Sequence, residues 1–294
     1  MDRYNIYMFK TLSETVMQGS CPYCDRDSFV YTYEDKKMFL CHHCQRHLSY
    51  EKVEKNVRSD NNGSGVTGFS NTVAVNFSGV LRNCTVLSNL SSDHDCILYA
   101  RSRKLPLSSY SDLYYCEDFR EIASYAEIEV GRSRRLILPL RNEKGELFGV
   151  QGRSLDGSEP RYITIMFDKN EEKLFGKDKV DMTKTFYVVE GPIDSLFLKN
   201  CIAMAGSDGL SDKYNSNAVL CFDNEPRNKQ IVDKVEKYID KGFKTVVWPD
   251  HIKEKDINDM ILKGIDVQGI IEQNTYAGLA AKIKFNVWKK TNGK

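Results

Sequence analysis

The chain has 294 residues, a net charge of +1 and 41% hydrophobic residues, the composition of a globular protein long enough for two domains. A balanced charge excludes a global basic field for nucleic acid or an anionic membrane, so any such binding must depend on local clusters. No apolar run approaches the roughly 20 residues that span a bilayer, and the start lacks a signal-peptide pattern, so we expect a cytoplasmic protein without membrane association.

Residues 1–50 predict a short amphipathic helix followed by a β-type zinc ribbon. Two C-x2-C pairs are separated by sixteen residues, and they consist of Cys21, Cys24, Cys41 and Cys44. Each pair forms a tight knuckle, so four thiolates can converge on one tetrahedral Zn²⁺. We expect one structural zinc per chain, with strands at "SFVYTY" and "MFLC". Such a ribbon either contacts single-stranded bases or only stabilises a small fold.

Residues 51–78 include "VRSDNNGSGVTGFSNTV", the composition of a flexible linker. Residues 79–183 predict a mixed α+β basic subdomain. Apolar residues have helical spacing in "DHDCILYARSRKL" and "LSSYSDLYY", and "RRLILPLRNEKGELFGVQGRSL" predicts two strands joined by a turn at Asn142 to Gly145.

Residues 184–262 alternate between strand and helix patterns, which predicts an α/β core with a parallel sheet. The strands are "TFYVVE", "CIAMAG", "AVLCFDN" and "KTVVW", and the helices are "DSLFLKN", "KQIVDKVEKYIDKG" and "DINDMILKG". Gly242 suits the position after the long helix, whose apolar face carries Ile231, Val232, Val235 and Ile239. Residues 263–294 predict a C-terminal helical segment.

Acidic residues follow three strands of this core. They are Glu190 and Asp194 in "EGPID", Asp223 and Glu225 in "FDNEP", and Asp256 in "KEKDIND". The carboxyl ends of parallel strands share one edge of a sheet, where ligands gather. In an extended strand, Asp223 and Glu225 would point to the same side. Taken alone, Asp194 and Asp256 each also suit a helix N-cap.

Like charges held at one edge are unfavourable unless cations offset them. Carboxylate oxygens suit Mg²⁺, and a pair of such ions serves phosphoryl transfer. We therefore expect two Mg²⁺, or Mn²⁺ in their place, bound by Glu190, Asp223, Glu225 and Asp256, with Asp194 in support.

Basic residues precede and follow these acids. Guanidinium forks and ammonium groups suit phosphate oxygens. We expect nucleic-acid and nucleotide contacts from Arg135, Arg153, Arg161, Lys177 and Arg227.

The segments "YVVEGPIDSLF", "CFDNEPRN" and "KDINDMI" resemble the TOPRIM core of the DNA primases of T-even-type bacteriophages. The similarity extends to the cysteine ribbon, "DHDCILYARSRKLP", "RRLILPL", "GVQGRSL", "RYITI" and "GLAAKIK". It implies that catalysis and metal binding fall on Glu190, Asp194, Asp223, Glu225 and Asp256. Glu225 stands where the broader TOPRIM pattern has an aspartate.

The resemblance also implies a function. Such an enzyme copies single-stranded DNA into short primers from ribonucleoside triphosphates during lagging-strand phage DNA replication, in the cytoplasm of the bacterial host. No G-x-x-x-x-G-K-[ST] motif is present, so the hexameric replicative helicase of the primosome would be a separate chain. A single-stranded-DNA-binding protein is a further expected partner.

Two other functions fit the same residues. A TOPRIM nuclease would use the acidic edge to hydrolyse DNA, and would shorten single-stranded DNA without making labelled oligoribonucleotides. A non-catalytic DNA-binding or recombination-mediator module would bind DNA through the ribbon and leave the acids unused.

Overall fold

The computed structural model describes residues 77–206 and 209–290, together with the backbone of five strands that precede residue 50. The chain divides into two compact units, one of Met1–Ala74 with Glu127–Glu129 and the other of Val75–Ala126 with Val130–Lys294. None of the helices in these ranges is long and apolar enough to cross a membrane.

The N-terminal unit contains a five-stranded antiparallel sheet in the order β1-β2-β3-β4-β5. Its strands are β1 Lys10–Ser13, β2 Val16–Ser20, β3 Asp27–Tyr33, β4 Lys36–Leu40 and β5 His47–Ser49. The expected strands are confirmed as β3 and β4. The expected N-terminal helix is wrong, because Val16–Ser20 pairs with β3 along its whole length and so satisfies its backbone in a sheet. Residues 51–76, where we expect the linker, lie outside the described residues.

The second unit begins with an antiparallel sheet in the order β10-β9-β8-β7-β6. Its elements are η1 Phe77–Leu81, β6 Thr85–Val86, η2 Leu87–Asn89, α2 Asp95–Ser102, η3 Leu107–Ser109, β7 Tyr114–Cys116, α3 Arg120–Ser124, β8 Arg135–Arg141, β9 Leu147–Ser154 and β10 Tyr162–Met166. The turn between β8 and β9 is confirmed: the Asn142 side chain accepts hydrogen bonds from the Lys144 and Glu146 backbones, and Gly145 has a φ of +79°.

One helix expected in this subdomain is wrong. The segment "LSSYSDLYY" forms the single turn η3 and then the strand β7. Tyr114 and Tyr115 pair with β8 on one side and β6 on the other, so sheet pairing replaces the helix that the apolar spacing suggests.

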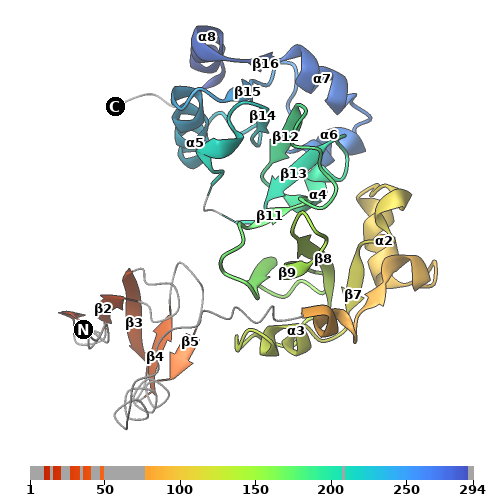
Figure 1. Ribbon diagram of the computed structural model, residues 1–294, viewed down its shortest axis with the longest axis vertical. Coiled ribbons are helices and arrows are strands. Elements are labelled where there is room, and N and C mark those ends of the chain that lie inside the picture. Colours follow the sequence, from red (N-terminus) through yellow and green to blue (C-terminus); the bar gives the residue numbers. More distant parts are fainter. Residues whose placement is uncertain are drawn as a thin grey trace, which may run out of the picture. The chain divides into compact units, whose positions relative to one another are not determined.

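The core contains a six-stranded sheet in the order β11-β13-β12-β14-β15-β16. The elements are β11 Leu174–Phe175, β12 Phe186–Val189, α4 Pro192–Ser195, β13 Cys201–Met204, η4 Asp212–Tyr214, β14 Ala218–Cys221, α5 Lys229–Asp240, β15 Lys244–Val246, α6 Ile257–Leu262, α7 Val267–Gln273, β16 Thr275–Tyr276 and α8 Gly278–Trp288. The four central strands are parallel, as expected, and the edge strands β11 and β16 run antiparallel to their neighbours. Helices α5 and α8 lie together on one side of the strands, and α6 and α7 lie on the other (Figure 1).

Helix α5 follows the expected pattern. Its apolar face is buried through Ile231, Val232, Val235 and Ile239. Gly242 follows the C-cap with a φ of +85°, the left-handed conformation that favours glycine. Helix α4 is shorter than expected, since it ends after one turn and continues as hydrogen-bonded turns to Leu198.

Candidate active site

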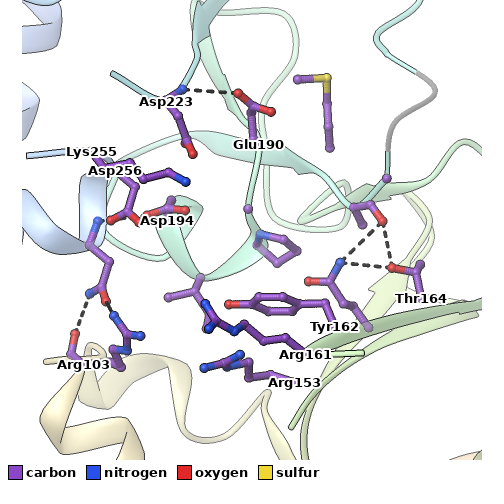
Figure 2. A pocket seen from close by; sticks show the side chains of 18 of the residues that line it. Arg103, Arg153, Arg161, Tyr162, Thr164, Glu190, Asp194, Asp223, Lys255 and Asp256 are labelled. Carbon is purple, nitrogen blue, oxygen red and sulfur yellow. Dashed lines mark hydrogen bonds between the residues drawn. The ribbon is translucent and has the colours of Figure 1, made fainter. Parts of the chain in front are cut away.

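Four of the five predicted acids line one pocket of about 550 Å³. Glu190 directly follows β12, Asp223 lies two residues after β14, and Asp256 ends the loop that follows β15. Asp194 belongs to α4. Figure 2 shows these four carboxylates around the upper part of the pocket. The parallel sheet therefore collects the acids at one edge.

Glu190 is held by two neighbouring elements. Its Oε1 accepts a hydrogen bond of 3.3 Å from the Asp223 backbone N–H, and its Oε2 forms a 3.0 Å ion pair with Lys234 of α5. Both partners contact the carboxylate oxygens directly. The side chain is thereby fixed between β14 and α5 and remains in the pocket wall.

Asp194 and Asp256 organise the start of α6. Asp256 is the N-cap residue, and its Oδ1 accepts from the Asp259 N–H at 2.7 Å. Asp194 does not cap its own helix, whose N-cap is Gly191. Its Oδ1 instead accepts from the Asn258 N–H at 2.9 Å. Asp194 therefore uses the free N–H groups of a neighbouring helix.

Burial, followed by repulsion from neighbouring acids, raises two carboxyl pKa values. Burial, and then the charge of Asp256, raise the pKa of Asp194 to about 7, although the Asn258 N–H acts in the opposite direction. Burial, with Glu190, Asp194 and Asp256 as neighbours, raises the pKa of Asp223 to about 8, and Lys255 opposes this shift. The pocket thus concentrates negative charge that its own cations do not fully offset.

These acids fit an Mg²⁺ site that the substrate helps to complete. Among the described residues, no three His, Cys, Asp or Glu side chains are arranged to hold a metal ion by themselves. Mg²⁺ usually binds one or two carboxylates and completes its shell with waters and substrate phosphates. The oxygen donors of the four carboxylates in the pocket match that requirement.

Glu225 does not line the pocket with the other acids, contrary to expectation. Strand β14 ends at Cys221, so the two-residue period does not reach Asp223 and Glu225. The Glu225 N–H donates to the Asp223 carbonyl in a tight turn. Its carboxylate pairs with Lys255 at 3.2 Å and accepts from Asn228 at 3.4 Å. We therefore remove Glu225 from the metal-binding set.

The opposite wall of the pocket is basic and aromatic. Two of the residues predicted to contact phosphate, Arg153 and Arg161, line it together with Tyr99, Arg103 and Tyr162. The Arg153 guanidinium lies 4.9 Å from the centre of the Tyr162 ring, and its Nε donates to the Tyr99 hydroxyl at 3.1 Å. Figure 2 shows Arg103, Arg153, Arg161 and Tyr162 below the acids.

Three predicted basic contacts lie outside this pocket. Arg135 is 1% exposed, and its guanidinium donates hydrogen bonds to the Ser133 hydroxyl and to the Gly152 and Pro160 carbonyls inside the subdomain. Lys177 is 7% exposed and pairs with Glu171 at 3.3 Å. Arg227 is exposed. Burial rules out the first two as direct phosphate contacts.

Sequence reasoning missed Asn258, which joins the two walls. Its side chain exchanges hydrogen bonds with Arg103: Asn258 Nδ2 donates to the Arg103 carbonyl at 2.7 Å, and Arg103 donates to Asn258 Oδ1 at 3.1 Å. The same residue donates its backbone N–H to Asp194. Lys234 and Lys255 were also missed. Only Lys255 had a sequence signal, since it directly precedes Asp256.

The predicted zinc ligands lie outside the described residues. The described strands nevertheless bracket them: the first cysteine pair falls between β2 and β3, and the second falls between β4 and β5.

No family model matches the chain. Its sequence is similar to the DNA primase of Enterobacteria phage T4, with 32% identity over 224 residues that cover 71% of this chain and 65% of the phage protein. It is also similar to the DNA primase of Thermotoga maritima, with 25% identity over 142 residues that cover 42% of this chain and 25% of that protein. The chain therefore matches just under two thirds of the length of the phage relative.

Solved primase structures share the fold. The zinc-binding and RNA polymerase domains of the Aquifex aeolicus primase align with 95% of this chain and 83% of that one, at a TM-score of 0.54 and 16% identity. A DnaG primase catalytic domain bound to single-stranded DNA aligns with 65% of this chain and 76% of that one, at a TM-score of 0.51 and 16% identity. These structural similarities confirm the predicted fold class, and the sequence similarity to the phage primase confirms the resemblance to primases.

Proposed function

We propose that this chain is a DNA primase that synthesises short oligoribonucleotides on single-stranded DNA for lagging-strand phage replication. The observation that supports this most directly is the pocket itself, in which four carboxylates face three arginines and two tyrosines. Acids suit metal-assisted transfer of a nucleotidyl group, and the basic wall suits polyanionic substrates.

The four acids of the pocket share one proposed task, which is to bind Mg²⁺. Mg²⁺ bound by Glu190, Asp194, Asp223 and Asp256 would neutralise the triphosphate and favour ionisation of the attacking 3′-hydroxyl. Lys234 and the Asp223 N–H hold the Glu190 carboxylate in place, and the Asn258 N–H fixes one oxygen of Asp194. The carboxylates are therefore preorganised before substrate binds.

The opposite wall orients the substrates. Arg153 and Arg161 are assigned to phosphate groups of the template or of the incoming ribonucleoside triphosphate, and Arg153 is held in place by Tyr99. Preorganised guanidinium groups lose little freedom on binding a phosphate. Arg227 is exposed and is assigned to a template contact beyond the pocket.

The remaining parts of the proposal concern partners. A zinc ion bound by Cys21, Cys24, Cys41 and Cys44 would stabilise the N-terminal sheet, which would contact the template. A separate hexameric helicase and a single-stranded-DNA-binding protein would complete the primosome in the bacterial cytoplasm.

A primer-synthesis assay tests this proposal. Single-stranded templates covering all trinucleotides are incubated with labelled ribonucleotides and Mg²⁺, with and without a cognate helicase. We expect labelled oligoribonucleotides from the natural chain and none from Asp223→Ala. Shortened DNA without labelled products would favour the nuclease instead. An Asp223→Ala variant as active as the natural chain would contradict the assigned site.

A further inference from the structure

Four side chains of β9 and β10 share one face of the sheet and line the pocket. Tyr162 pairs with Arg153 across the two strands, and Thr164 pairs with Gln151. Residues two apart in a strand point to the same side, so these four form a two-by-two patch. All four line the pocket, and Figure 2 shows Arg153, Tyr162 and Thr164 across it from Asp223.

Gln151 contributes an unpaired acceptor to this patch. The residue is 6% exposed, and its Nε2 donates to Thr164 Oγ1 at 3.0 Å and to the Ala205 carbonyl at 3.4 Å. Its Oε1 is buried and has no hydrogen-bond partner among the described residues. Buried side-chain oxygens usually have a partner, so an orphan in the wall of a pocket indicates a donor on a ligand.

The neighbouring groups determine which end of the Gln151 amide faces them. The Ala205 carbonyl can only accept, and the Thr164 hydroxyl donates its hydrogen to that same carbonyl at 2.8 Å. Both groups therefore require a donor from Gln151, and its NH₂ group is the one that faces them. The Oε1 atom is left as a fixed acceptor that can meet only a donor.

A planar surface lies beside this acceptor. Tyr162 is 43% exposed, whereas Phe119 and Phe148 of the same subdomain are buried. The Arg153 guanidinium covers its ring at 4.9 Å and is itself held by the Tyr99 hydroxyl. Aromatic rings and guanidinium planes are the surfaces on which unpaired nucleobases stack.

We propose that this patch selects a nucleobase with an exocyclic amine, which stacks on Tyr162 and donates a hydrogen bond to Gln151 Oε1. Adenine, cytosine and guanine carry such an amine, whereas uracil, hypoxanthine and unsubstituted purine do not. The amine belongs either to the incoming triphosphate or to a template base. The inference rests on the proposed function and names the substrate class that the site prefers.

Equilibrium binding distinguishes the two sources. In one arm, ATP is compared with purine riboside triphosphate, and GTP with inosine triphosphate. In the other arm, template oligonucleotides containing deoxyadenosine or deoxyguanosine are compared with their amine-free analogues. In one of the two arms we expect the amine-free ligand to bind about 10-fold more weakly, because it leaves the buried acceptor unpaired.

Gln151→Met keeps the side-chain length and removes the acceptor. This variant should bind the amine-bearing and amine-free ligands equally, whereas Gln230→Met, on the exposed surface of α5, should keep the preference. Circular dichroism checks that both fold. If Gln151→Met does not fold, Thr164→Val provides the test, because without Oγ1 the amide can turn and the preference should fall.

Two results would overturn the inference: equal binding of both ligand classes in both arms, or an undiminished preference in the Gln151 variant. The proposed function fails separately, if no labelled primers form on any template. Binding preference without primer synthesis would refute the primase and support the base-selecting patch. Primer synthesis without any binding preference would support the primase and refute the base-selecting patch.

Discussion

Replacing Asp223 with asparagine should stabilise the metal-free protein at high pH. The pKa of this carboxyl rises from 3.8 to about 8, first because it is buried and then because Glu190, Asp194 and Asp256 surround it. An acid with a raised pKa stabilises the fold fully below its unfolded pKa, and that stability is lost as the pH rises through the folded pKa. The relevant window therefore runs from about pH 4 to about pH 8.

The cost of ionising Asp223 is on the order of 2–5 kcal/mol, since one pKa unit corresponds to roughly 1 kcal/mol and the open pocket admits some water. Asparagine avoids that cost. With about 2–4 °C per kcal/mol for a chain of this size class, the variant should melt at least roughly 4 °C higher than the natural chain at about pH 9.

Thermal melts from about pH 5 to about pH 9 in excess chelator measure this effect. The natural chain should melt at lower temperature as the pH rises, and added Mg²⁺ should restore most of the loss because it binds only the ionised site. Asp223→Asn should show a smaller response to pH and to Mg²⁺, because Asp194, whose pKa is raised to about 7, still titrates in this range. Asp233→Asn, on the exposed surface of α5, is the matched control and should keep them. A melting temperature of the natural chain that does not fall with pH, or an Asp223→Asn variant less stable at high pH, would refute the reasoning.

Three other outcomes are expected. Lys234→Gln should lower the rate of primer synthesis by about 10-fold or more, because Glu190 loses its ion-pair partner. Lys229→Gln on the same helix should leave the rate unchanged, and steady-state kinetics measures both. Asn258→Ala should cost about 1–3 kcal/mol in chemical denaturation, because the Arg103 carbonyl loses its donor; unchanged unfolding would contradict that role. Chelation should release one zinc per chain, measured by a colorimetric indicator. It should lower the affinity for template but leave the melting temperature of the C-terminal unit unchanged. An absence of zinc would disprove the ribbon.

The sequence predicts the acidic edge well because that edge follows from topology alone. Any acid just after β12 or β14 reaches the carboxyl edge of a parallel sheet, which is why Glu190 and Asp223 were found. Glu225 was misplaced because its position depends on where β14 ends, and strand ends have only a weak local signal.

The contacts of the basic residues, by contrast, could not be predicted from the sequence. A positive charge suggests phosphate in a sequence, but the fate of Arg135 is decided by carbonyls of Gly152 and Pro160, which only the folded subdomain brings to it. Lys234 is missed for the same reason, since 44 residues separate it from Glu190. Pairings of this kind require the three-dimensional structure.

The reciprocal hydrogen bonds between Asn258 and Arg103 have a mechanical consequence. They join the end of α2, in the antiparallel subdomain, to the start of α6, in the parallel core, and Lys104 reinforces the junction through the Ile261 and Leu262 carbonyls. The acids belong to the parallel core, whereas Arg153 and Arg161 belong to the antiparallel subdomain. The width of the pocket between them therefore depends on this junction. Substrate fit in the pocket should therefore respond to substitutions of Arg103 and Asn258, although neither side chain is assigned to the metal.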